Sequence, residues 1–238
     1  MDIQIHGPKI IFSIPIFGGI DVTETTVNAW LIIGFVFILC LILTHKMEKI
    51  PRTYRQKIAE KVVVAVDNLV ESTMGKRNMA YAPYILTLLV FSAFGSLIGM
   101  LGFRSVTADI NTTLGWALMT FVLIYHSGLK HKGIKYFKGF IEPIPVMLPL
   151  NLISEMATPI SLSFRHFGNI LSGMIISILM YGGLAAASSA IIPNSVPFLQ
   201  LGIPAVFSVY FDLFSSCIQA YVFSMLTMVY VSNANDPD

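Results

Sequence analysis

The stretch SLSFRHFGNI, residues 161–170, places a permanent positive charge, Arg165, inside one of the most apolar parts of the chain. From residue 143 to residue 181, the only acidic, basic or histidine side chains are Glu155, Arg165 and His166. Arg165 is also the last lysine or arginine of the chain. A charge at the centre of a bilayer costs at least about 2.5–3.5 kcal/mol. This arginine therefore requires a compensating anion or a wet cavity.

The composition is that of an integral membrane protein. Of the 238 residues, 55% are hydrophobic and only 12% are charged, with a mean hydropathy of +0.75, whereas soluble domains carry about a quarter charged residues. Several apolar runs reach the roughly 20 residues that a spanning helix needs. Because these runs are continuous rather than alternating, they favour helices over a β-barrel. We expect an all-α protein with a single membrane domain.

Hydropathy predicts five spans and one surface helix. The first 26 residues form an external segment, and residues 53–77 mix apolar and charged side chains as an amphipathic helix on the membrane surface does. The spans are predicted at residues 27–45, 81–103, 109–129, 143–190 and 196–233.

The last two apolar segments are too long for upright spans. A continuous helix over residues 143–181 would measure about 58 Å, twice the hydrocarbon thickness. We expect a steeply inclined antiparallel hairpin with a turn near Pro193 and a bend near Pro159.

The basic residues predict the orientation. Of the 15 lysines and arginines, eight lie in residues 46–77 and four in residues 130–138, while Lys9 and Arg104 stand apart. Since basic residues prefer cytoplasmic loops, the N-terminus is predicted outside and the C-terminus in the cytoplasm. The sequence has no recognisable signal or transit peptide, which favours a bacterial plasma membrane. The basic loops are expected to meet anionic headgroups and peripheral partners.

The helix face around Arg165 is small and polar. Positions three or four residues away include Ser161, Gly168 and Asn169, and such a stripe faces protein or water rather than lipid. His166 points about 100° away, so it is interpreted as structural. In the predicted hairpin, Arg165 lies opposite residues 219–223.

Gln219 is therefore the expected cross-helix partner of Arg165. Its amide can hydrogen-bond the guanidinium but cannot neutralise it. The missing anion is thus expected on another chain.

Further polar residues suggest an ion path. Asp212, Ser216 and Gln219 follow one another at spacings of three and four. An aspartate within a span indicates an ion path or proton relay, with a carboxylate satisfied by a neighbouring hydroxyl as the alternative. Asp109 and Asn111 fit a helix cap and an ion entry equally well.

The cytoplasmic side of Arg165 has its own candidates. Glu155 lies ten residues before Arg165 and is interpreted as an inner mouth, with Ser161 between them. The chain shows no Gly-rich phosphate loop, no metal-ligand cluster and no nucleophile with a base. We therefore expect no cofactor, metal site, catalytic site, nucleotide binding or nucleic-acid partner.

Four motifs together resemble subunit a of bacterial rotary F-type ATP synthases. They are SLSFRHFGNI, NLISEMATPI (151–160), DINTTLGWAL (109–118) and SSCIQAYVFSMLTMVYVS (215–232). The resemblance runs from about residue 27 to the C-terminus.

The resemblance implies a mechanism and partners. The family arginine that matches Arg165 faces a rotating ring of c subunits, whose membrane carboxylates supply the anion. Two offset half-channels load and unload these carboxylates, and the arginine separates them. Asn169 matches the position beside it, Gln219 the position facing it, and Asp109 a position in the outer half-channel. Such a subunit is non-catalytic, contacts subunit b of the peripheral stalk and lies in the lipid bilayer.

The chain departs from this family pattern at two positions. Many relatives carry a glutamate nine residues after the arginine, where this chain has Met174. Many bacterial relatives carry a histidine or serine seven residues before the glutamine, where this chain has Asp212. Compared with those relatives, the carboxylate is on the facing helix, at Asp212. This favours a place for Asp212, with Ser216, in the outer half-channel. The coupling ion, H⁺ or Na⁺, stays open.

Three other functions were weighed. A secondary transporter, the main alternative, often shows internal repeats, and none is apparent here. A membrane enzyme needs a catalytic pair on one face, and Asp212 has no such partner in its span. A purely structural subunit has no need of Arg165.

Overall fold

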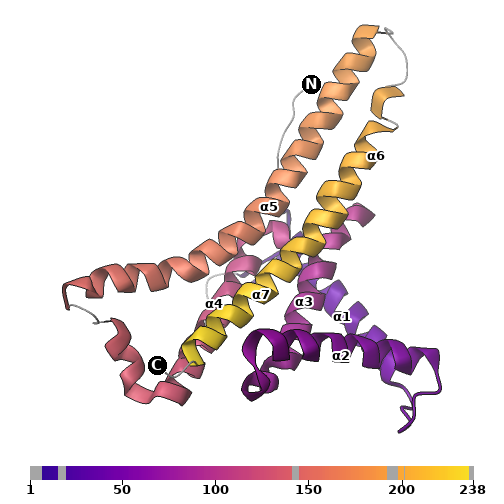
Figure 1. The fold of residues 1–238 in the computed structure, drawn as a ribbon. Coiled ribbons are helices and arrows are strands. Elements are labelled where there is room, and N and C mark those ends of the chain that lie inside the picture. The colour runs from indigo at the N-terminus through magenta and orange to yellow at the C-terminus, as the bar shows by residue number, and fades with distance from the viewer. Residues whose placement is uncertain (1–6, 16–19, 141–144, 192–197, 201, 236–238) are drawn as a thin grey trace.

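The computed structural model describes residues 7–15, 20–140, 145–191, 198–200 and 202–235, and these are mostly helical (Figure 1). Within them, four helical segments are long and apolar enough to cross a membrane. They are α1 (Glu24–Thr44), the segment Lys76–Leu101, α5 (Leu148–Ile191) and the segment Val209–Asn235. The predicted class of a helical membrane protein is confirmed at this level.

The predicted third span corresponds to α4 (Ile110–Lys132), which is not among those four segments. This helix has the length of a span, but several threonines interrupt its apolar surface and its last turn carries Lys130, His131 and Lys132. The structure therefore supports four spans by composition, and the fifth stays a prediction.

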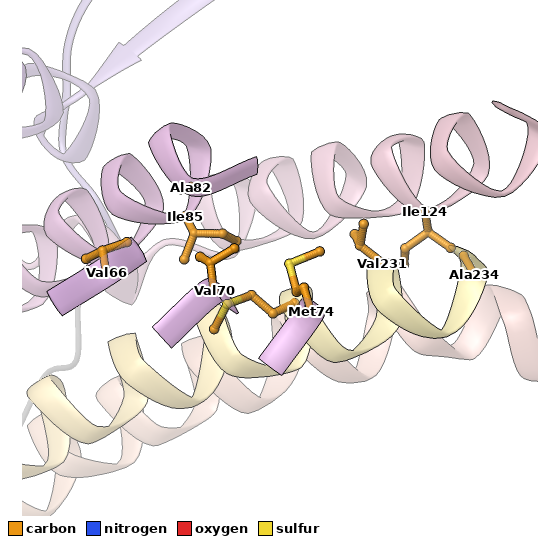
Figure 2. Packing of buried hydrophobic residues seen from close by; sticks show 9 residues of the cluster. Val66, Val70, Met74, Ala82, Ile85, Ile124, Val231 and Ala234 are labelled. Atoms are coloured by element: carbon orange, nitrogen blue, oxygen red, sulfur yellow. The ribbon is translucent and has the colours of Figure 1, made fainter. Parts of the chain in front are cut away.

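The core joins α2 (Tyr54–Met74) to the helices beside it. Val66, Val70 and Met74 are buried and lie four residues apart, so they share one helix face. They pack against Ile85 of α3 (Ala82–Leu97) and Val231 of α7 (Ser215–Asn235), as Figure 2 shows. The helix η1 (Lys76–Tyr81) connects α2 to α3.

Buried hydrogen bonds close the same end of the bundle. The Tyr81 hydroxyl lies 2.7 Å from Ser127 Oγ, and Ser127 donates to Asn235 Oδ1. Asn235 Nδ2 donates in turn to Asn78 Oδ1 at 2.9 Å. Each of these polar groups has a partner, as buried polar groups require, and together they fix α4 and the end of α7 against η1.

The N-terminal segment contains a short β-ribbon, which the all-α prediction missed. Strands β1 (Ile10–Ile14) and β2 (Ile20–Thr23) pair antiparallel, and Ser13 Oγ donates to Asp21 Oδ1 at 2.7 Å. Strands this short carry too little alternation to be recognised from sequence. The ribbon leads directly into α1, whose N-cap residue is Thr23.

Two short helices, η2 (Ile98–Leu101) and η3 (Val106–Ala108), link α3 to α4. The helix η4 (Gly133–Phe140) follows α4, and η5 (Pro145–Met147) precedes α5. The helices α3 and α4 both pack against α7, and α4 also packs against α5.

The two long arms run side by side, as Figure 1 shows. The first arm, α5, has 44 residues and is therefore about 66 Å long. Pro159 lies inside it and removes the N–H that would bond the carbonyl of Glu155, which gives a cause for the bend visible in Figure 1. The predicted start at Pro143 and turn near Pro193 lie outside the described residues.

The second arm is built from several pieces. The helices η6 (Phe198–Gln200) and α6 (Ile203–Ser208) lead into η7 (Val209–Phe214), which is a π-helix, and α7 continues it. A π-helical turn widens the helix locally and is frequent at functional sites. Nothing in the sequence pattern had indicated it.

One glycine of α4 is required by close packing. A Cβ at Gly128 would lie 2.5 Å from Tyr136 Cε2, whereas one at Gly115 would meet nothing within 4 Å. Gly128→Ala should therefore destabilise the fold by about 1–3 kcal/mol through overpacking. The melting temperature of the purified complex measures this effect. Gly115→Ala is the matched control and should leave the temperature unchanged or raise it slightly; equal behaviour of the two variants would contradict the packing described here.

Candidate functional site

The two arms of the hairpin pack against each other and carry all the predicted site residues except Asp109 and Asn111. Asn169 Nδ2 donates to Ser215 Oγ at 2.8 Å, which joins α5 to α7. The rings of His166 and Phe223 also meet, with centroids 5.4 Å apart. These contacts agree with the predicted register, in which Arg165 lies opposite residues 219–223.

Arg165 lies on the outer surface of this hairpin. It is exposed, as are Ser161 and Ser172, four residues before it and seven after it on the same helix face. Ser163 and His166, on other sides of the helix, are completely buried. One face of α5 therefore packs inside the protein and the face with Arg165 looks outward.

No carboxylate neutralises Arg165 within the described parts of the chain. Two ion pairs of the described residues are Arg52 with Glu48 at 3.9 Å and Lys76 with Glu71 at 3.5 Å, and neither includes Arg165. Both involve α2 or the residues directly beside it, and all four side chains are largely exposed. The guanidinium of Arg165 is thus exposed on a long apolar helix without an acidic partner among the described residues.

Gln219 and Ser216 lie on the inner side of the second arm. Their exposed fractions are 6% and 2%. The Nε2 atom of Gln219 is buried with no hydrogen-bond partner among the described residues. Because a buried donor without a partner is costly, this amide is a functional candidate rather than a packing residue.

Asp212 belongs to the π-helix η7 and is half-buried. It precedes Ser216 by four residues at the junction between η7 and α7. Close to this junction, a Cβ at Gly173 of α5 would lie 3.7 Å from Phe211 Cβ. The widened turn that carries Asp212 therefore packs directly against the first arm.

Asp109 caps α4. Its Oδ1 accepts from the backbone N–H of Asn111 at 3.0 Å, and its Oδ2 accepts from Thr25 Oγ1 at 2.6 Å. The side chain of Asp109 is only 8% exposed, whereas Asn111 is exposed. The cap interpretation of Asp109 is confirmed, and the bond to Thr25 also ties α4 to α1.

Glu155 lies near the other end of α5 and is half-buried. It lies ten residues from Arg165, or about 15 Å along the helix, so the two do not form one site. Aromatic side chains of α4 and η4 lie close to it. Burial raises the pKa of Tyr136 to about 12, and the charge of Glu155 acts in the same direction.

Several buried hydroxyl groups lie near this site, and the sequence pattern did not identify them as candidates. Ser92 lies 3.4 Å from His166 Nε2, and Thr113 Oγ1 lies 3.1 Å from Ser163 Oγ. Small polar residues repeated at helical spacing within apolar spans are the signal that indicates such contacts. Across the described residues, no three His, Cys, Asp or Glu side chains are placed to hold a metal ion.

Comparisons with known proteins connect this geometry to a family. A family model for the ATP synthase A chain matches residues 26–232, which include every candidate site residue. The chain is 31% identical to the ATP synthase subunit a, sodium ion specific, of Propionigenium modestum, over 97% of this chain and 86% of that protein.

Two further relatives show the same extent of similarity. The ATP synthase subunit a of Geobacter sulfurreducens is 33% identical, over 86% of this chain and 84% of that protein. The ATP synthase subunit a of Trichlorobacter lovleyi is 30% identical, over 90% of both chains. The resemblance inferred from the four motifs is confirmed.

The bond between Asn169 and Ser215 should stabilise the pairing of the two arms. Asn169→Ala and Ser215→Ala should each lower the melting temperature of the complex. The double variant should lose about 0.6 kcal/mol less stability than the sum of the two single losses, because both variants break the same bond. Ser189→Ala is a control, because Ser189 is exposed and its hydrogen bond among the described residues goes to Ala185 of its own helix. Its effect should add to that of Asn169→Ala. Strict additivity of Asn169→Ala with Ser215→Ala would contradict the bond.

Proposed function

Because the chain belongs to the ATP synthase A chain family, we propose that Arg165 is the fixed charge past which the carboxylates of a rotating c-ring move. The chain is an ion-translocating stator subunit of a bacterial F-type ATP synthase. The observation that carries the proposal is the exposure of Arg165 on a spanning helix, without an acidic partner in the described residues. Since a charge within a bilayer is expensive, a carboxylate on the ring surface is the partner that best fits this position.

The field of Arg165 gives it two tasks. A nearby positive charge favours the ionised form of a carboxylate and lowers its pKa, so a ring carboxylate releases its ion on arriving at Arg165. The same fixed charge repels a cation that would cross directly from one side to the other. Moving each charge through the membrane potential supplies about 2.3 kcal/mol per 100 mV to turn the ring.

The remaining residues form the two access routes. Asp212, Ser216, Asp109 and Asn111 belong to the outer half-channel in this proposal, and Glu155 with Ser161 to the inner one. Support for the outer route comes from the buried positions of Asp109 and Ser216. The exposed Ser161, one turn from Arg165, supports an inner route that opens on the ring face.

Gln219 and Asn169 flank the arginine. Asn169 is held by its bond to Ser215, and Gln219 has a buried donor available. In the proposed complex they position the arms beside Arg165 and exclude a direct path between the two half-channels.

The proposed topology has five spans, counting α4, with α2 on the cytoplasmic surface. The N-terminal segment lies outside and the C-terminus in the cytoplasm, following the placement of the basic residues. The subunit is non-catalytic and lies in the bacterial plasma membrane, where subunit b and lipid are its other neighbours.

The coupling ion has two candidates. The Propionigenium modestum relative is named as sodium ion specific, so Na⁺ is tested beside H⁺ for this chain.

The test is ATP-driven ion uptake into vesicles that carry the whole complex with Arg165→Ala. Uptake of the coupling ion, followed separately for H⁺ and for Na⁺, should fall by at least about tenfold, the factor that corresponds to 1.4 kcal/mol. Passive leak through the membrane sector should rise because the separating charge is lost. Ser172→Ala removes an exposed hydroxyl from the same face and should leave uptake unchanged. Normal uptake by an assembled Arg165→Ala complex would contradict the proposal.

A further inference from the structure

A buried pair of hydroxyl groups, on Thr113 and Ser163, lies close to the start of α4. The backbone N–H of Thr113 donates to the carbonyl of Asp109 at 3.3 Å, one turn into α4. Thr113 Oγ1 then lies 3.1 Å from Ser163 Oγ on α5, and both residues are completely buried. Ser163 precedes His166 by one helical turn, so this pair reaches the inner side of the first arm.

A second set of buried hydroxyl groups reaches His166 from α3. Thr107 Oγ1 lies 2.9 Å from Ser105 Oγ and 2.8 Å from Ser96 Oγ. Ser92 follows one turn away on α3, and its Oγ lies 3.4 Å from His166 Nε2. All of these hydroxyl groups are at least nine-tenths buried. The hydroxyls of α3 thus contact the imidazole through Ser92, whereas those of α4 reach Ser163, one helical turn from His166 on α5.

His166 is completely buried and is only partly satisfied there. The ring of Trp116 lies 5.7 Å from it and that of Phe223 5.4 Å, centroid to centroid. Its second nitrogen, Nδ1, is buried without a hydrogen-bond partner in the described chain, as is Nε2 of Gln219, one turn from Phe223. Two orphaned polar atoms in an apolar interior are costly unless a ligand or water reaches them.

We propose that His166 forms the inner end of the outer half-channel. There the buried hydroxyl groups pass the coupling ion, either H⁺ or hydrated Na⁺, to the space beside Arg165. This inference deepens the proposed function and rests on it. The sequence indicates only a structural role for His166. Its contact with Ser92, the buried Ser163 one turn away and its unsatisfied Nδ1 add a positioning role.

The chemistry of the groups suits such a path. Serine and threonine hydroxyls both donate and accept hydrogen bonds, and an imidazole can do both through its two nitrogens. None of these groups except Asp109 carries a fixed charge, so they can orient water without trapping a cation. His166 is also the chain neighbour of Arg165, which lies on the exposed face of the same helix. The path therefore crosses α5 from its buried side to its ring-facing side.

The test measures whether water reaches these buried positions, because a polar cluster with only a structural role would exclude water. The whole complex is prepared with Cys40→Ala and Cys217→Ala, and single cysteines are introduced as Thr113→Cys, Ser163→Cys and Ser92→Cys. A small positively charged methanethiosulfonate reagent, added from the external side, should modify these cysteines at least about tenfold faster than the control. Ser224→Cys is that control, because Ser224 is equally buried and bonds Ala220 of its own helix. Equal, slow modification at all four positions would overturn the inference.

Ion transport provides a second, independent test. His166→Leu removes both ring nitrogens and should lower ATP-driven uptake of the coupling ion by about tenfold or more, while His166→Gln should restore most of the uptake. Ser224→Ala should behave as the unmodified protein. Full uptake with His166→Leu would overturn the inference, and if that variant does not assemble, the cysteine modification decides.

The Arg165→Ala variant, measured in the same vesicles, separates the two claims. Loss of uptake with Arg165→Ala but not with His166→Leu would retain the proposed function and reject only the role of His166. Normal uptake with Arg165→Ala would reject the proposed function itself and, because it rests on it, this inference too. The vesicles are tested with H⁺ and with Na⁺, and the ion whose uptake responds identifies what the path carries.

Discussion

The arrangement of this protein depends on one electrostatic constraint, the placing within a spanning helix of a guanidinium that has no acidic partner among the described residues. Arg165 has a helix face of its own, with Ser161 and Ser172 exposed beside it. A cation at this depth is tolerated only where an anion or water compensates it. The rest of the hairpin is organised around presenting that charge outward.

Rigidity comes from the opposite side of the same helices. The buried face of α5 is fixed to α7 through the Asn169–Ser215 bond and the contact between His166 and Phe223. The far end of α7 is held by Asn235, which is bonded both to Ser127 and to Asn78. Because lipid provides no hydrophobic force between helices, hydrogen bonds and close packing carry this role. These contacts hold the inner faces of the two arms together and leave the face with Arg165 exposed.

The sequence predicted the parts of this structure that follow from local chemistry. Hydropathy located the helical segments, and the predicted antiparallel hairpin agrees with the contacts of Asn169 with Ser215 and of His166 with Phe223. The π-helix around Asp212 and the pairing of β1 with β2 were not predictable, because each is a short local feature without a distinctive sequence pattern. The hydroxyl contacts of Ser163 and Ser92 depend on how three helices are rotated against one another, which a single sequence does not specify.

If the face of Arg165 meets the ring, cross-linking between that face and a ring subunit detects the contact. In the whole complex lacking Cys40 and Cys217, Ser161→Cys should form a disulfide with a cysteine placed beside the ring carboxylate, and this link should stop ATP-driven transport until it is reduced. Ser163→Cys, two residues away but on the buried side of α5, should form no such link. Cross-linking from Ser163→Cys, or its absence from Ser161→Cys in an assembled complex, would contradict the orientation on which this account rests.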